Sequence, residues 1–148
     1  MSELNIPTFW FWPNVDAGSD GTSKGIRSFR EKGNIDNIHF FKNMKGLDFL
    51  RLLYNSECLI GNSSVGIREC AFLGIPVVNI GSRQNKRIRG NNVIDINYSK
   101  EEIKNAITSH INSPKPKCSD VYGGGDAGIK IAQTLSEVPL IFHKTITF

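Results

Sequence analysis

A run of small polar residues, 61–64 (Gly-Asn-Ser-Ser), stands between a short apolar strand pattern and a helical pattern. A chain that turns there from a strand into a helix brings free backbone N–H groups, hydroxyl groups and the positive end of the helix dipole to one point. Such a point binds anions and suits phosphate. One of Asn62, Ser63 and Ser64 is expected to cap the helix, but capping requires only one such residue. The run predicts a phosphate site, with capping alone as the alternative.

A carboxylate follows this run at Glu69. With a rise of about 1.5 Å per residue, it is expected one turn, roughly 5–8 Å, inside the helix. That distance is close to the step from a pyrophosphate to its ribose. A carboxylate there can accept hydrogen bonds from both ribose hydroxyls, as the acidic residue does in dinucleotide sites. The alternative is a solvated Glu69 that pairs with Arg68 or a lysine.

Two more polar segments follow strand patterns. Residues 13–19 (Pro-Asn-Val-Asp-Ala-Gly-Ser) form a candidate site, although such a cluster is also typical of a turn with a helix cap. Residues 81–92 carry four cations within seven positions, at Arg83, Lys86, Arg87 and Arg89. No aromatic residue is interleaved for base stacking, so contact with a phosphorylated small molecule fits better than nucleic-acid binding. A solvated loop is the alternative.

One formal motif is rejected. Residues 123–128 match G-x-G-x-x-G, but no strand pattern precedes them and no acidic residue follows at the required distance of about 20 positions. We expect this segment to be a glycine hinge that leads into the last helix.

The composition is that of an ordinary globular domain. The chain has 148 residues, 39% of them hydrophobic, and its net charge of +4 favours anionic partners. No apolar run approaches the ~20 residues of a membrane span, and residues 6–12 are broken by Pro7 and lack a basic start, so we expect a cytoplasmic protein without a membrane partner. Three scattered cysteines and three scattered histidines predict free thiols and no metal site.

Strand and helix patterns alternate along the chain, which predicts an α/β fold with a doubly wound parallel sheet of the Rossmann type. The aromatic run at 8–12 is apolar in both alternating sets, as in a strand covered on both faces. Further strands are expected at 35–41, 58–60, 75–80 and 93–96. Helices are expected at 22–32, 47–54, 66–73, after the capping box 99–102, and at 127–138. We expect one lobe over residues 1–138 and a tail over 139–148. In such sheets the ligand binds at the carboxyl ends of the strands, where the three polar segments stand.

Four of these segments together resemble a known family. Residues 13–19, 61–69, 76–84 and 122–128 look, in this order, like the carboxyl-terminal half of UDP-N-acetylglucosamine 2-epimerases. The similarity points to the hydrolysing branch, which makes N-acetylmannosamine or its diacetyl-bacillosamine counterpart for sialic-acid-type sugars. It spans roughly Thr8 to Leu135. The resemblance implies a glycosyltransferase-B-like fold, with UDP and its amino sugar in a cleft between two Rossmann-like lobes.

The resemblance also implies roles for individual residues. Ser63 and Ser64, in the motif with Gly66, would hold the UDP phosphates, and Glu69 would hold the ribose. The segment around Lys42, Asn43 and Met44 would cover the uracil, Asn14 would face the UDP, and Asp16, Ser19 and Arg83 would line the same cleft or a neighbouring regulatory pocket. Family enzymes eliminate UDP across C1–C2 and then add water to the glycal, without a metal or organic cofactor.

The resemblance implies a missing partner as well. The family's amino-terminal lobe, with its acid–base carboxylates, has no counterpart in these 148 residues. Elimination needs a base near C2, so we expect no catalytic residue in the chain and no activity without that lobe. The chain departs from the family at Lys86, Asn91 and Gly124, where Gly, Glu and Asp are usual, which leaves the shape of those loops open.

Two other functions remain open at this point. A glycosyltransferase of the same fold usually carries a further acidic residue two turns before the ribose carboxylate, and Gly61-Asn62 offers none. A non-catalytic module that binds nucleotide sugars is the other alternative. The oligomeric state is open too, a homo-oligomer included.

Overall fold

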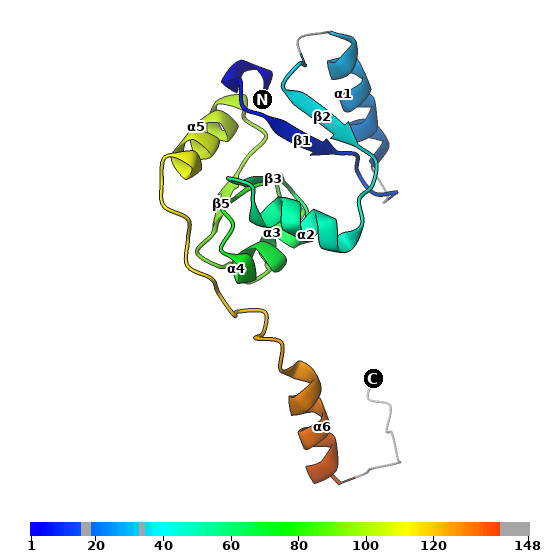
Figure 1. The fold of residues 1–148 in the computed structure, drawn as a ribbon, viewed down its shortest axis with the longest axis vertical. Coiled ribbons are helices and arrows are strands. Elements are labelled where there is room, and N and C mark those ends of the chain that lie inside the picture. Colours follow the sequence, from blue (N-terminus) through cyan, green and yellow to red (C-terminus); the bar gives the residue numbers. More distant parts are fainter. Residues whose placement is uncertain (16–18, 33–34, 140–148) are drawn as a thin grey trace, which may run out of the picture.

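Short parallel strands alternate with helices along the chain, so the α/β prediction is confirmed. A computed structural model describes residues 1–15, 19–32 and 35–139 (Figure 1). The strands are β1 (Thr8–Phe11), β2 (Ile38–Phe41), β3 (Leu59–Gly61), β4 (Val77–Ile80) and β5 (Val93–Ile96). The helices are α1 (Ser19–Glu31), α2 (Gly46–Tyr54), α3 (Ser64–Ile67), α4 (Glu69–Leu73), α5 (Lys100–Ile111) and α6 (Ala127–Glu137), with a short 3-10 turn at Ser2–Leu4.

The strands form two parallel sheets instead of the one that the sequence predicts. β1 pairs with β2, and β3, β4 and β5 pair in sequence order. The apolar pattern of a strand determines which faces are buried, but it does not determine which edges come together. The alternation of strand and helix patterns therefore predicted parallel pairing correctly. It did not predict that β2 and β3 belong to different sheets.

β4 is the central strand of the larger sheet and separates two apolar clusters. Neighbouring strand residues point to opposite faces. Val77 packs with Leu53, Cys70 and Ile75 on the face covered by α2 and α4, and Val78 packs on the other face with α5. Helices therefore cover both faces of this sheet, and its carboxyl edge is left for the loops.

The aromatic strand β1 is less covered than predicted. Trp10 stacks on Phe40 of β2 and contacts Phe29 of α1, so one face is packed. On the other face, Phe11 meets Phe49 of α2 edge-on, but Phe9 remains 48% exposed. The prediction of a strand buried on both faces is wrong at Phe9, because α2 reaches only the carboxyl end of β1.

The segment after α5 crosses the surface and then leaves it. Lys115 donates to the carbonyl of Ser56 (3.0 Å), and the backbone N–H of Ser119 donates to the carbonyl of Ala71 (2.8 Å). Two glycines with positive φ, Gly123 at 106° and Gly125 at 90°, then lead into α6. α6 has no buried residue and projects away from the sheets in Figure 1. Within the described ranges, no helix has the length and apolar character needed to cross a membrane.

Candidate functional site

The carboxyl ends of β3 and β4 bring two of the predicted site segments together. Gly61 lies in register with Asn79, so the loops after these parallel strands leave the same edge of the sheet. The Gln84 amide donates to the carbonyl of Asn62 (2.8 Å), and the Arg83 guanidinium lies 3.5 Å from the same oxygen. The serine segment and the basic loop 81–92 are therefore in direct contact.

The serine segment opens α3 as the sequence predicts. Ser63 is the N-cap residue, with extended backbone angles (φ −72°, ψ 143°), and its Oγ accepts from the backbone N–H of Val65. Ser63 is exposed and Ser64 is half-buried, so the start of α3 faces solvent. The backbone N–H groups of both serines have no acceptor among the described residues. Capping thus uses one of the three polar residues and leaves two N–H groups and the Ser64 hydroxyl open.

Glu69 does not lie one turn inside a continuous helix, which corrects the prediction. The helical pattern 66–73 divides at Arg68, whose ψ of −73° ends α3 and starts α4. Gly66, the residue with the weakest helix propensity here, lies in the short first helix. Glu69 is therefore in the first turn of α4. One of its carboxylate oxygens lies 3.9 Å from Arg68, and the other, Oε2, is buried without a hydrogen-bond partner among the described residues.

Gly66 is placed for packing. It is buried, and a Cβ atom there would lie 2.9 Å from Cγ1 of Val77 and 3.3 Å from Cδ2 of Leu59. The absence of a side chain lets α3 approach β4 closely. This contact accounts for the glycine whether or not its backbone also meets a ligand.

Gly66→Ala is accordingly expected to lower the free energy of unfolding by about 1–3 kcal/mol, the usual cost of overpacking. Urea denaturation measures the change. Gly128→Ala in α6 is the matched control, because nothing lies within 4 Å of a Cβ there and alanine favours the helix. Equal stability of Gly66→Ala and the wild type would contradict the packing role.

One cation of the basic loop, Arg89, forms hydrogen bonds within the fold. Arg89 donates to both carboxylate oxygens of Asp95 in β5 (2.9 and 3.2 Å) and to the carbonyl of Arg87 (2.6 Å). The buried amide of Asn79 also donates to Asp95. Hydrogen bonds from Arg89 lower the pKa of Asp95 below 3.8, assisted by Asn79. Of the four predicted cations, Arg89 therefore has a structural role, while Lys86 and Arg87 are exposed.

This network predicts a pH-dependent contribution to stability. Because the pKa of Asp95 is lowered on folding, its ionised form stabilises the fold fully above pH 3.8, and the contribution is lost as the pH falls below that value. The difference in unfolding free energy between the wild type and Asp95→Asn should shrink between about pH 6 and about pH 3. Denaturation at several pH values measures it. In an Arg89→Met background the pH dependence of the difference should largely disappear, and its persistence there would contradict the assignment to Arg89.

Asn14, Lys42 and Met44 lie at the carboxyl edge of the β1–β2 sheet. Phe11 is in register with Phe41, so the segments that follow, with Asn14 and Lys42, leave the same edge. Asn14 and Lys42 are exposed and Met44 is half-buried, with its N–H bonded to the Asn43 side chain (2.8 Å). Asp16 lies outside the described residues. Among the described residues, no hydrogen bond or ion pair joins this edge to Ser63, Ser64 or Glu69.

Cavities lie at both ends of the β3–β5 sheet. One, of about 320 Å³, lies beyond β4 and β5; it is lined by Gly81, Ser82, Asn85, Asp95, Ile96, Asn97, Tyr98 and Glu102. Ligands bind at the carboxyl ends of parallel strands, and this rule singled out residues 81–92 after β4. Asn97 and Tyr98 directly follow β5, so the same rule would have singled them out from the sequence. The Glu102 carboxylate accepts from the N–H of Asn97 (3.1 Å), which shows that this loop is held to α5.

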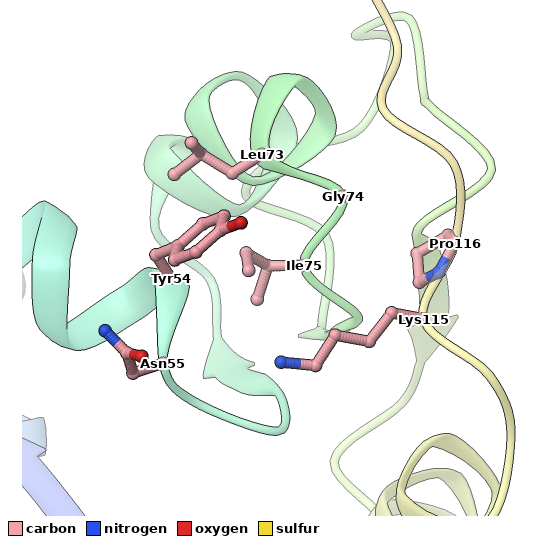
Figure 2. A pocket seen from close by; sticks show the side chains of 7 residues that line it. All are labelled: Tyr54, Asn55, Leu73, Gly74, Ile75, Lys115 and Pro116. Carbon is pink, nitrogen blue, oxygen red and sulfur yellow. The ribbon is translucent and has the colours of Figure 1, made fainter.

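The other cavity, of about 400 Å³, lies at the opposite end of the sheet. Figure 2 shows Tyr54, Ile75 and Lys115 around it, beneath Leu73 and Gly74 at the end of α4. Tyr54 precedes β3, and Leu73, Gly74 and Ile75 precede β4, so this cavity is remote from the loops at the carboxyl edge. Neither cavity is lined by Ser63, Ser64 or Glu69.

The thiols are not part of the candidate site. Cys70 is fully buried, and burial raises its pKa to about 12. Burial also raises the pKa of Cys58 to about 11, while Cys118 is exposed on the crossing segment. Among the described residues no group of His, Cys, Asp and Glu side chains is arranged to hold a metal ion.

Comparison with known proteins gives a consistent set of relatives. A family model described as UDP-N-acetylglucosamine 2-epimerase matches residues 2–136. A UDP-N,N'-diacetylbacillosamine 2-epimerase (hydrolyzing) of Legionella pneumophila is 34% identical over 136 residues, which are 92% of this chain and 35% of that protein. A UDP-N-acetylglucosamine 2-epimerase of Neisseria meningitidis is 30% identical over 126 residues, 85% of this chain and 32% of that protein.

A third relative, the polysialic acid biosynthesis protein P7 of Escherichia coli, is 35% identical over 99 residues, 67% of this chain and 24% of that protein. The chain thus spans about a third or less of the length of the curated relatives it matches.

Proposed function

Since the chain belongs to the UDP-N-acetylglucosamine 2-epimerase family, we propose that it forms the UDP-binding part of a hydrolysing epimerase that acts on a UDP-amino sugar. One observation carries the proposal. Among the described residues, the N–H groups of Ser63 and Ser64 at the exposed start of α3 have no acceptor, and a buried carboxylate oxygen of Glu69 has no donor. Unpaired donors suit a diphosphate, and an unpaired acceptor suits ribose hydroxyls.

The proposed pose follows from these groups. The diphosphate binds at Ser63 and Ser64, with Arg83 and the exposed cations of the basic loop supplying positive charge. Glu69 accepts hydrogen bonds from the ribose. The segment 42–44 covers the uracil, Asn14 faces the UDP, and Asp16 lines the same cleft or a neighbouring regulatory pocket; this part rests on the family resemblance. Gly66 supports the site by letting α3 lie close to β4.

We propose that the chemistry needs more than this chain. In the family resemblance UDP leaves by elimination across C1–C2, which requires abstraction of the C2 proton, and water then adds to the glycal. The relatives are about three times as long as the part they share with this chain. The base and the clamps for the sugar would come from that further part of an epimerase. A glycosyltransferase is the weaker candidate, because the family match covers residues 2–136.

Calorimetry with UDP tests the binding proposal. The wild type is expected to bind UDP, and Ser64→Ala should weaken binding about tenfold, as loss of a hydrogen bond to a charged group does. Ser28→Ala is the matched control, since it removes an exposed helical hydroxyl in α1. Failure of the wild type to bind UDP, or equal affinities of Ser64→Ala and the wild type, would overturn the assigned site.

A further inference from the structure

Gln84 is a buried polar residue in the cationic loop, between exposed neighbours. Its neighbours Arg83 and Asn85 are exposed, whereas Gln84 itself is 3% exposed. Its amide donates to the carbonyl of Asn62, which is 22 positions earlier in the chain (2.8 Å). Gln84 therefore joins the loop after β4 to the loop after β3, from the inside.

This contact fixes the orientation of one peptide plane. The carbonyl of Asn62 and the N–H of Ser63 belong to the same trans peptide unit, so they point in opposite directions. When Gln84 holds the carbonyl towards the basic loop, the N–H of Ser63 is directed away from it. That N–H is one of the two donors that have no acceptor among the described residues.

The amide oxygen of Gln84 indicates that the N–H groups of this side chain are the ones that matter. The oxygen Oε1 is buried and has no hydrogen-bond partner among the described residues. A buried acceptor without a donor costs free energy, which an apolar side chain of the same shape would avoid. A glutamine is thus suited to this position through its N–H groups and not through its oxygen.

We propose that Gln84 is a positioning residue for the diphosphate: it holds the Asn62–Ser63 peptide so that the Ser63 N–H faces the ligand. The inference rests on the proposed UDP binding. Gln84 does not contact the ligand itself, and it acts on the phosphate contacts while leaving those of the nucleoside unchanged. The Arg83 guanidinium, 3.5 Å from the same carbonyl, assists it from the exposed side.

The test compares Gln84→Met with the wild type. Methionine keeps the length of the side chain and removes both the NH₂ group and the oxygen of the amide. The affinity for UDP and for pyrophosphate should each fall by about three- to tenfold, as loss of one ordinary hydrogen bond implies, while the affinity for uridine stays unchanged. Asn37→Ala is the matched control, because the Asn37 amide also joins distant segments, by donating to the carbonyl of Ile6 (2.9 Å), but away from this edge. It should change none of the three affinities.

A second variant covers the case in which Gln84→Met does not fold. In Gln84→Glu, the ionised carboxylate cannot donate to the Asn62 carbonyl, whereas the protonated acid can. The ratio of its UDP affinity to that of the wild type should therefore rise towards one as the pH is lowered.

The outcomes separate the two proposals. If the wild type does not bind UDP, the proposed function itself fails. If the wild type binds UDP and Gln84→Met binds it equally well, or loses uridine affinity to the same degree, the positioning role is wrong. A pH-independent ratio for Gln84→Glu would overturn it as well.

Discussion

Glu69→Ala is expected to remove the preference of the chain for UDP over 2′-deoxy-UDP. If the carboxylate accepts hydrogen bonds from both ribose hydroxyls, the wild type should bind UDP about ten times more tightly than the deoxy analogue, because a hydrogen bond to a charged acceptor is lost. In Glu69→Ala the two ligands should bind with equal affinity. Calorimetry with both ligands on both proteins measures the four affinities.

The geometry of Glu69 explains why the effect is large. Its Oε2 atom is buried without a donor among the described residues, so a ribose hydroxyl would not have to displace a protein partner. The contact of the other oxygen with Arg68 is long, at 3.9 Å, and both side chains are partly exposed, so this ion pair contributes little. The double comparison of protein and ligand also cancels any general effect of removing a negative charge near a diphosphate.

Glu101→Ala provides the control for this experiment. Glu101 is also a carboxylate in the first turn of a helix, α5, and it is exposed. It should keep the wild-type ratio of UDP to deoxy-UDP affinity. A ratio near one in the wild type, or an unchanged ratio in Glu69→Ala, would show that Glu69 does not hold the ribose.

The sequence predicted the elements that position the site well, because each has a strong local signal. Ser99 caps α5 with a hydrogen bond from the N–H of Glu102, which is one half of the predicted capping box, while the Glu102 carboxylate accepts from the N–H of Asn97. β5 occupies the predicted residues 93–96. Ser63, one of three candidates, caps α3. Caps and short apolar runs are encoded within a few residues, so they can be read from the sequence without the fold.

The errors concern features that depend on residues far apart in the chain. The break between α3 and α4 accompanies the close packing of Gly66 on Val77, a contact across 11 positions that the helical pattern does not contain. Phe9 is exposed because α2 covers only Phe11 on that face. The residues of a strand determine neither how far a helix covers it nor which strand edges pair.

Gln84 is the clearest case of a residue that the sequence could not single out. It stands between Arg83 and Asn85 in a loop that composition assigns to the surface, yet it is buried and bonded to Asn62. Arg89 is the converse case, since it counted as a candidate for phosphate contact but is bonded to Asp95. The residue types show which charged and polar groups are available at this edge. Only the packing of the loops determines which of these groups can contact a ligand and which are bonded within the fold.

Because carboxylates at this edge are bonded within the fold, the purified chain should bind UDP-N-acetylglucosamine without releasing UDP from it. Elimination needs a free base near C2, and the loss of such a base alone costs about 10²- to 10⁴-fold in rate. Three carboxylates at the described carboxyl edge of β3–β5 are already assigned. Glu69 is proposed to hold the ribose, Asp95 is bonded to Arg89 and Asn79, and Glu102 accepts from Asn97.

A coupled assay for free UDP tests this expectation. The rate with the chain should not exceed the background, whereas the Neisseria meningitidis relative, a UDP-N-acetylglucosamine 2-epimerase, serves as the positive control in the same mixture. Glu69→Ala, purified identically, distinguishes a contaminant from the chain, because a contaminating enzyme would remain in both preparations. UDP release that is proportional to the amount of chain and absent from Glu69→Ala would show that these residues supply the base as well. The assignment of Asp95 and Glu102 to the fold would then have to be revised first.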